Sequence, residues 1–217
     1  MRNLFLFLLV ALCAMPASAQ SNTDPYYARR ATLFELLPIG KKDIVFLGNS
    51  LTDGCEFNEL FNNRHVKNRG IVGDIIQGAI DRIDPIIQGQ PKKIFILSGV
   101  NDISHGVDAD SIARVMERLI ALIQQGSPRT RIYLQSILPF NNDVRLWKNL
   151  KDREHVVVEA NALLKQLAIR RHVTWIDLYP LFVDGNGRLR ADLTNDGLHL
   201  MGPGYLIWRD VIARYVR

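Results

Sequence analysis

The stretch Ile-Val-Phe-Leu-Gly-Asn-Ser-Leu-Thr at residues 44–52 joins an apolar run to a short polar turn. Residues 44–47 are apolar at every position, which is typical of a strand buried on both faces of a parallel sheet. Gly48, Asn49 and Ser50 follow where the chain leaves this strand. Because ligands of open α/β sheets bind at the carboxyl ends of the strands, Ser50 is a candidate functional residue from its position.

Outward from this stretch, apolar runs alternate with helical patterns. Runs rich in β-branched and aromatic residues recur at 94–97, 132–134 and 173–176, and a weaker strand is expected near Val66. Between the strands, apolar residues recur at three- and four-residue spacing, which predicts helices. The expected helices cover 75–87, Asp110 or Ser111 to about 125, 152–171, and a C-terminal stretch with Pro203 in its first turn. This alternation predicts a doubly wound α/β sandwich.

The first twenty residues have a different pattern. Arg2 precedes an apolar run at 4–15, and Ala17-Ser18-Ala19 then gives the small-x-small pattern that signal peptidase reads. This run is too short to span a bilayer as a helix, which needs about 20 residues. We therefore expect a signal peptide at 1–19, cut after Ala19, and a secreted or periplasmic protein with no stable membrane insertion. A retained anchor or a buried N-terminal helix is the alternative.

The rest of the chain is divided into two parts. A lead-in segment at 20–40 carries an expected helix at 24–36, and one domain follows at 41–217. With 217 residues, the chain is long enough for one well-cored domain and short for two. Signal cleavage leaves Cys55 as the remaining cysteine, so no intramolecular disulfide is expected. We expect its thiol to be buried or inert.

The composition is that of a globular protein. Hydrophobic residues make up 47% of the chain and charged residues 23%. The formal charge of +5 and the isoelectric point of about 9.4 are also compatible with a nucleic-acid partner. However, Lys and Arg are scattered, often beside Asp or Glu, and form no basic stripe with interleaved aromatic residues. We therefore expect no nucleic-acid partner, with anionic substrates or surfaces as the lesser alternative.

Three segments carry polar groups near the ends of predicted strands. Ser50, at the start of a helix, can offer a hydroxyl and a backbone N–H, although helix capping is the more common role. Asn101 follows the strand at 94–97, and its amide suits a developing oxyanion, with an Asx turn as the alternative. Gly73 precedes a helix and offers an unhindered N–H, or is a simple turn glycine.

A fourth segment, near the C-terminus, contains Asp196 and His199. Three-residue spacing in a turn can bring the carboxylate onto the imidazole and leave the other ring nitrogen for a nucleophile. Isolated histidines are more often structural or surface groups. We place the remaining histidines in that class, with His105 the least certain of them: His65, His105, His155 and His172.

Together, these four segments resemble the blocks of the SGNH/GDSL hydrolase family. The serine, glycine, asparagine and histidine of the family name correspond, in order, to Ser50, Gly73, Asn101 and His199. The resemblance covers about residues 43–216. It is greatest to the branch that contains platelet-activating-factor acetylhydrolase and bacterial carbohydrate (sialate) O-acetylesterases.

The resemblance implies a fold and an activity. The fold is a three-layer α/β/α sandwich with a parallel, flavodoxin-like five-stranded sheet, which makes 41–217 the hydrolase domain. The activity is that of a serine esterase that removes short acyl groups, especially acetyl, from small-molecule or glycan esters through an acyl-enzyme. Ser50, His199 and Asp196 would form the catalytic triad, and Ser50, Gly73 and Asn101 the oxyanion hole. No metal or organic cofactor is implied.

Two other functions remain open at this point. A lipid-directed lysophospholipase or acyl-thioesterase is the first, and a non-catalytic carbohydrate-binding protein on the same fold is the second. Asn49 replaces the aspartate that the family usually has before its serine, and we expect this to alter local hydrogen bonds but not the chemistry.

We expect specificity to reside in two loops, at 139–146 and 184–195. Both are predicted to leave the carboxyl end of a strand. The residues of interest in and beside them are Asn141, Asn142, Trp147 and 188–190. The oligomeric state does not follow from the sequence.

Overall fold

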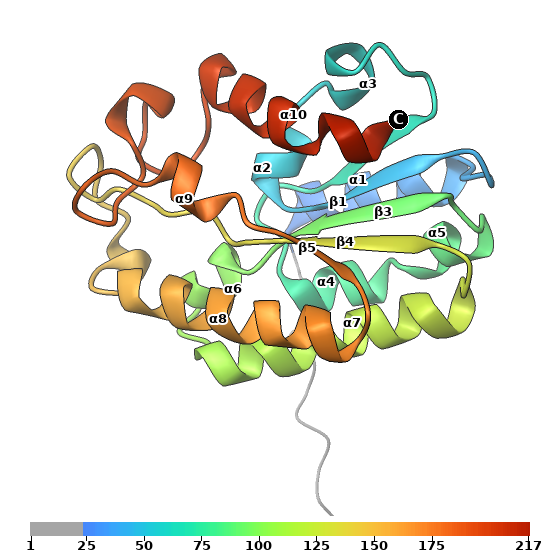
Figure 1. The fold of residues 1–217 in the computed structure, drawn as a ribbon, viewed down its shortest axis with the longest axis horizontal. Helices are drawn as coiled ribbons and strands as arrows, with labels where there is room; N and C mark the ends of the chain where they lie inside the picture. Colours follow the sequence, from blue (N-terminus) through green and yellow to red (C-terminus); the bar gives the residue numbers. More distant parts are fainter. Residues whose placement is uncertain (1–23) are drawn as a thin grey trace, which may run out of the picture.

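Five parallel strands form the centre of the molecule in the computed structural model, which describes residues 24–217 (Figure 1). The strands are β1 (Ile44–Gly48), β2 (Val66–Gly70), β3 (Lys93–Leu97), β4 (Arg131–Gln135) and β5 (Thr174–Ile176). Their order in the sheet is β2-β1-β3-β4-β5, and every neighbouring pair is parallel. The predicted flavodoxin-like sheet is confirmed. The predicted signal peptide at 1–19 lies outside the described residues.

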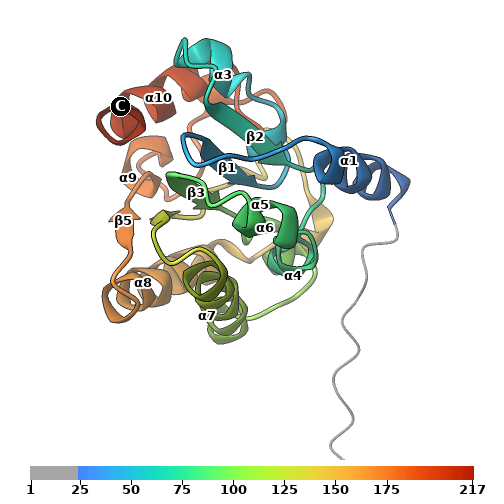
Figure 2. The ribbon, with the colours of Figure 1, turned by 90° about the vertical axis from the view of Figure 1, so that its right-hand side faces the viewer.

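Helices cover both faces of this sheet (Figures 1 and 2). On one face lie α2 (Ser50–Asp53), α3 (Phe57–Leu60), α9 (Tyr179–Phe182) and α10 (Gly202–Val216). On the other lie α4 (Ile76–Asp81), α5 (Asp84–Gln88), α6 (Val100–Ser104), α7 (Ala109–Gly126) and α8 (Glu154–Arg170). The lead-in helix α1 (Pro25–Leu36) lies near the β2 edge, and two short 3₁₀ turns are η1 (Lys148–Leu150) and η2 (Ala191–Leu193).

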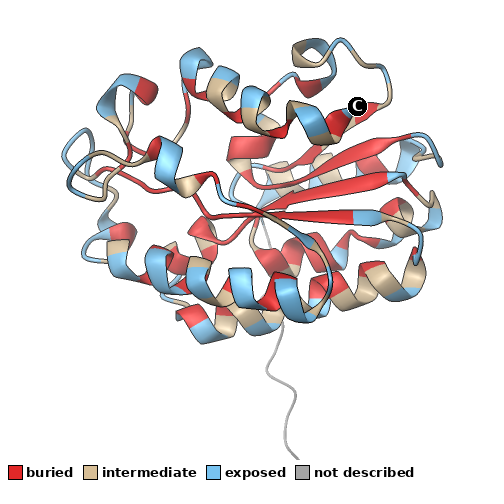
Figure 3. Cartoon of the chain, in the orientation of Figure 1, coloured by how far each residue is buried: buried red, intermediate tan, exposed pale blue. Residues whose placement is uncertain are grey.

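Alternation of side chains along each strand divides the interior into two cores. In β1, Val45 and Leu47 face the α4–α8 layer, whereas Ile44 and Phe46 face the α10 layer. The three central strands β1, β3 and β4 are therefore buried over almost their whole length (Figure 3), and the edge strands β2 and β5 less so. On the α10 side, Phe46 stacks on Phe95 with ring centroids 4.8 Å apart, and this aromatic row stiffens the part of the sheet that ends beside Ser50.

Most predicted helices are found. The structure differs from the predictions in one helix, in one helix cap and in the position of one loop. The helix predicted at 75–87 is two helices, α4 and α5, because Pro85 in the first turn of α5 supplies no N–H to a longer helix. Asp108, not Asp110 or Ser111, caps α7, since its carboxylate accepts the Ser111 N–H at 2.7 Å. The loop at 184–195 follows α9 and not a strand.

Within residues 24–217, no helix has both the length and the apolar character needed to cross a bilayer.

A buried ion pair fixes the carboxyl ends of β1 and β2. Asp74 accepts from Arg82 at 2.6 Å (Nη2) and 3.0 Å (Nε), and both side chains are at most 5% exposed. Arg82 also donates to the backbone carbonyls of Gly48 and Arg69, the last or near-last residues of the two strands. One guanidinium thus ties together the strand ends from which the chain enters the Ser50 and Gly73 turns.

We expect Arg82→Gln to destabilise the fold by about 3–5 kcal/mol, because it leaves the Asp74 carboxylate buried without a counter-charge. Urea unfolding followed by circular dichroism measures this. The matched control is Arg190→Gln, which breaks the exposed pair between Arg190 and Asp192 and should leave the urea midpoint in place. An Arg82→Gln midpoint equal to that of the native chain would contradict the role given to this pair.

Candidate active site

Ser50 is the first residue of α2, directly after β1. Asn49 caps this helix, with its Oδ1 accepting the Leu51 N–H at 3.1 Å. The Ser50 N–H is one of the donors that the start of a helix leaves unpaired, and it gives no hydrogen bond to another described group. The serine is partly exposed. The Nδ2 of Asn49 is buried and has no partner among the described residues.

Ser50, His199 and Asp196 form one chain of hydrogen bonds. His199 Nε2 lies 2.9 Å from Ser50 Oγ, and His199 Nδ1 lies 2.7 Å from Asp196 Oδ2. A neutral imidazole that donates from Nδ1 to Asp196 leaves Nε2 free to accept the Ser50 proton. The arrangement is that of a nucleophile, a general base and a group that orients the base.

The turn that carries Asp196 and His199 is held by its own backbone. Asp196 Oδ1 accepts the N–H groups of Leu198 and His199 at 2.9 and 2.8 Å. Gly197 has a φ of +80°, and a Cβ there would lie 2.1 Å from the Asn141 carbonyl oxygen, so only glycine fits. The Asp196 carboxylate is therefore fixed by hydrogen bonds within its own loop, in addition to its contact with the imidazole.

These contacts also set the charge of Asp196. Burial alone would raise the pKa of this carboxyl group, but the hydrogen bonds from the His199 imidazole and from the His199 and Leu198 N–H groups together lower it. Asp196 is thus an anion that can balance a protonated imidazole. By contrast, Cys55 is buried, as expected, and this burial raises the pKa of its thiol to about 12, with the nearby Glu56 charge adding to the shift.

Asn101 and Gly73 offer further N–H donors. Asn101 lies in the first turn of α6, and its Nδ2 donates one hydrogen to the Asp74 carbonyl at 2.8 Å, which fixes the amide and leaves its second N–H. Gly73 has a φ of +75°, nothing lies within 4 Å of where its Cβ would be, and its N–H has no acceptor among the described groups. Both donors follow strands that neighbour β1 in the sheet.

Asp102, next to Asn101, is buried and faces the start of α4. Both of its carboxyl oxygens lie 3.3 Å from the Ile76 nitrogen. Burial raises its pKa to about 7 in spite of this bond and of its own backbone N–H. Through its contact with the Ile76 N–H, Asp102 connects α6 to the start of α4.

Trp147 is a predicted specificity residue, and in the structure it also contacts Asp196 and His199. Its indole N–H donates to the Asp196 carbonyl at 2.7 Å, and its ring lies edge-on to His199 with centroids 5.9 Å apart. The sequence does not reveal this bond, because the partners are 49 positions apart. Asn141 ties the two predicted loops together, donating its Nδ2 to the Leu189 carbonyl.

The other predicted residues have surface or structural roles. Arg188 is paired with Asp143, and Arg190 with Asp192. His65 lies 3.1 Å from Asp43, far from the triad in the fold at the opposite end of β1.

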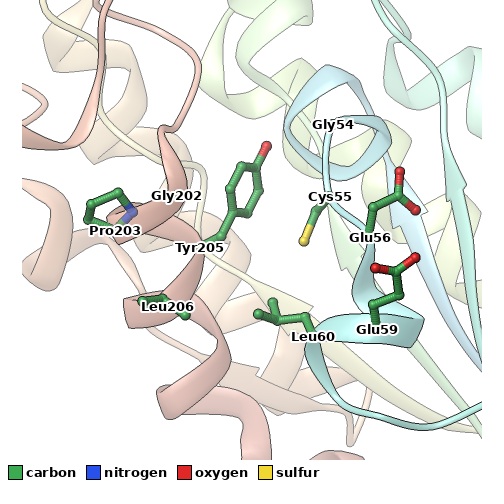
Figure 4. Close-up of a pocket in the computed structure, with 9 residues that line it drawn as sticks. All are labelled: Gly54, Cys55, Glu56, Glu59, Leu60, Gly202, Pro203, Tyr205 and Leu206. Atoms are coloured by element: carbon green, nitrogen blue, oxygen red, sulfur yellow. The ribbon is translucent and has the colours of Figure 1, made fainter.

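Two hollows are relevant to the candidate site. One, of about 330 Å³, is lined by Asn101, Trp147 and Leu198 among others. The second, of about 560 Å³, lies between the end of α2 and the start of α10, with an apolar wall of Leu60, Leu206 and Tyr205 (Figure 4). Figure 4 shows Cys55 at this hollow and Glu56 and Glu59 along one side.

The family follows from comparison with known proteins. The model of the GDSL-like lipase/acylhydrolase family matches residues 46–207, which include Ser50, Gly73, Asn101, Asp196 and His199. The chain therefore belongs to this family and is an ester hydrolase.

Individual relatives agree with this assignment. The alpha2 subunit of platelet-activating factor acetylhydrolase IB from Rattus norvegicus is 30% identical over 173 residues, 75% of this chain and 71% of that protein. A solved structure from Streptococcus pneumonia, named for platelet activating factor, gives a TM-score of 0.81 at 26% identity and covers 88% of this chain and 93% of that one. An acetyl-xylooligosaccharide esterase from Geobacillus Stearmophilus shares the fold, with a TM-score of 0.66 at 18% identity over 82% and 95% of the two chains.

Proposed function

We propose that the protein is a serine esterase that removes short acyl groups, specifically acetyl, from carbohydrates, neutral sugars and sialic acids both included. The observation that carries the proposal is the position of His199, 2.9 Å from Ser50 Oγ and 2.7 Å from Asp196 Oδ2. Relatives named as acetylhydrolases and as an acetyl-xylooligosaccharide esterase support the acetyl group and the saccharide.

In the first half of the reaction, Ser50 Oγ attacks the ester carbonyl carbon while His199 Nε2 takes the hydroxyl proton. The negative charge that develops on the carbonyl oxygen is bound by the N–H groups of Ser50 and Gly73 and by the free amide N–H of Asn101. Asp196, kept ionised by its hydrogen bonds, balances the imidazolium. His199 then gives the proton to the departing alcohol, which leaves acetyl on Ser50.

In the second half, water attacks the acetyl-enzyme. His199 takes a proton from the water, the same three donors bind the second oxyanion, and the proton returns to Ser50 Oγ as acetate leaves. Every group needed is a side chain or backbone N–H of this chain.

The proposal is tested with 4-nitrophenyl esters of increasing chain length and with acetylated xylooligosaccharides. We expect the acetyl ester to be the best of the series and the saccharides to release acetate. A clear preference for octanoate and longer chains would overturn the acetyl assignment.

A second candidate is a lipid-directed enzyme, a lysophospholipase or acyl-thioesterase. The hollow of about 560 Å³ in Figure 4 favours it, because its walls are the segment that follows α2 and the start of α10, and an acyl chain would suit their apolar side chains. The same chain-length series decides between the two candidates, since only the lipid-directed enzyme gains from longer acyl chains.

Trp147 positions the Asp196 turn in this proposal, so Trp147→Phe should lower kcat about 10-fold with little change in KM, through loss of one hydrogen bond. Phenylalanine keeps the ring edge against His199 but removes the N–H that Asp196 accepts. Trp175→Phe is the matched control, because the Trp175 indole N–H has no partner among the described residues. Equal kcat values for both variants would show that the bond to Asp196 does not position the triad.

Export is part of the proposal. The apolar run at 4–15 and the Ala17-Ser18-Ala19 site support a cleaved signal peptide and a secreted or periplasmic enzyme. Polymeric saccharides outside the cytoplasm are substrates to which such an enzyme has access.

A further inference from the structure

The hollow that begins at Asn101 continues into a third one. The first, of about 330 Å³, and its neighbour, of about 490 Å³, share Ser104, Lys148 and Asn149 as walls. They lie between α6 and the segment that contains η1, which contact each other. Together the two hollows form a groove beside Asn101, with a size suited to a small ligand.

Cationic side chains line this groove. Arg145 and Lys148 line the part next to Asn101, and Lys148, Lys151 and Arg153 line the farther part with His105. The Arg153 guanidinium lies over the loop after α6, where a Cβ added at Gly106 would be 3.8 Å from its Nη2.

Carboxylates do not neutralise these charges. Neither hollow has an aspartate or glutamate among its lining residues. Over residues 24–217, none of the four cationic side chains takes part in an ion pair. Of the acidic residues nearby, Asp102 is buried against α4 and Asp143 pairs with Arg188, while Asp152 and Glu154 are not among the lining residues.

The cationic groove is also connected to the triad. The Arg145 guanidinium lies over the Trp147 ring, 5.3 Å from its centroid, and the same indole donates to the Asp196 carbonyl. A group bound at Arg145 and Lys148 would therefore lie on the segment that holds the Asp196 turn. Since an acetyl group is small, the part of the ester that reaches into this groove is the alcohol.

We infer that the natural substrate is an acetylated saccharide whose sugar carries an anionic group, a carboxylate or a sulfate, which binds in the groove of Arg145, Lys148, Lys151 and Arg153. This inference rests on the proposed esterase function and narrows its substrate. Uncompensated like charges next to an active site attract an oppositely charged ligand and raise its local concentration.

The test compares sugars that differ in the substituent at one position, which is neutral in one probe and anionic in the other two. The probes are a methyl glucuronoside, a methyl glucoside and a methyl glucoside 6-sulfate, acetylated at the same hydroxyl groups, with acetate release as the readout. We expect kcat/KM for one or both anionic sugars to exceed that for the neutral sugar by about 10-fold at low salt, as for one favourable charge contact. The advantage should shrink as sodium chloride rises from about 0.05 M to about 0.5 M, where screening is strong.

Lys148→Gln, in the wall shared by both hollows, should reduce the anionic-to-neutral ratio at least about 3-fold. Lys42→Gln is the matched control, because Lys42 is an exposed lysine at the opposite, amino-terminal end of β1. Whichever anionic sugar is preferred identifies the group as carboxylate or sulfate. A ratio near one in the native enzyme, or a ratio unchanged by Lys148→Gln, would overturn the inference. Failure to hydrolyse even 4-nitrophenyl acetate would instead overturn the proposed function.

Discussion

Ser50→Ala should reduce the hydrolysis of 4-nitrophenyl acetate by about 10⁴- to 10⁶-fold in kcat, the usual cost of removing the nucleophile of a serine hydrolase. The reason is local. Ser50 Oγ is the atom that is proposed to form the bond to the acyl carbon, and it lies 2.9 Å from His199 Nε2. Alanine removes that atom and retains the α2 backbone and the Asn49 cap. The Ser50→Ala protein should therefore remain folded and lose its hydrolysis of the ester.

The measurement needs a control for the effect of replacing a serine away from the site. Ser111→Ala serves, since Ser111 lies on α7 and its side chain contacts Arg114 at the surface. Its rate should equal that of the native enzyme. Native and Ser50→Ala proteins with equal rates would place the reaction elsewhere, and a lack of turnover in both, with retained glycan binding, would support a non-catalytic carbohydrate-binding role on this fold.

The sequence was sufficient for the architecture because the decisive signals are local. Runs such as 44–47 and 94–97 are apolar at every position and rich in β-branched or aromatic residues, which is typical of strands covered on both faces. The order of alternating strands and helices then leaves few topologies. The error at 75–87 has a local cause as well. The apolar spacing continues through Pro85, and the missing N–H of that proline divides the pattern into two helices.

The candidate site could be predicted only in part. Ser50, Gly73 and Asn101 follow strands, so their position in sequence already indicates a shared edge of the sheet. Asp196 and His199 lie in a short turn that follows no strand, and only the family resemblance implies their place in the site. The contacts that hold them are between distant segments. Arg82 reaches the Gly48 carbonyl across 34 positions, and Trp147 reaches Asp196 across 49.

The groove illustrates the same limit. In sequence, Lys148, Lys151 and Arg153 alternate with uncharged and acidic residues, as on any solvated surface. Only the fold reveals that they share a hollow with His105 from the loop after α6. The scattered Lys and Arg residues of the sequence do not reveal that four of them lie beside Asn101, because this requires three-dimensional packing.

Asn101→Ala should lower kcat by about 10²- to 10³-fold, with KM for a small ester nearly unchanged, because the amide is proposed to bind the oxyanion and not the ground-state carbonyl. The donor is already oriented. Its Nδ2 gives one hydrogen to the Asp74 carbonyl at 2.8 Å, so no reorganisation is needed when charge develops. Asn58→Ala, at an exposed site on α3, is the matched control and should leave kcat in place.

Asn101→Asp separates the chemical role of the amide from its packing role. The variant has almost the same shape, but its carboxylate has no hydrogen to give and faces both the Asp74 carbonyl and the site of the developing negative charge. If Asn101 is an oxyanion donor, aspartate must be at least as damaging as alanine in kcat. If the side chain only supports the Asp74 turn, aspartate and alanine should instead lower stability in urea while kcat falls by less than about 5-fold. That result would remove Asn101 from the site and leave the oxyanion to the backbone donors of Ser50 and Gly73.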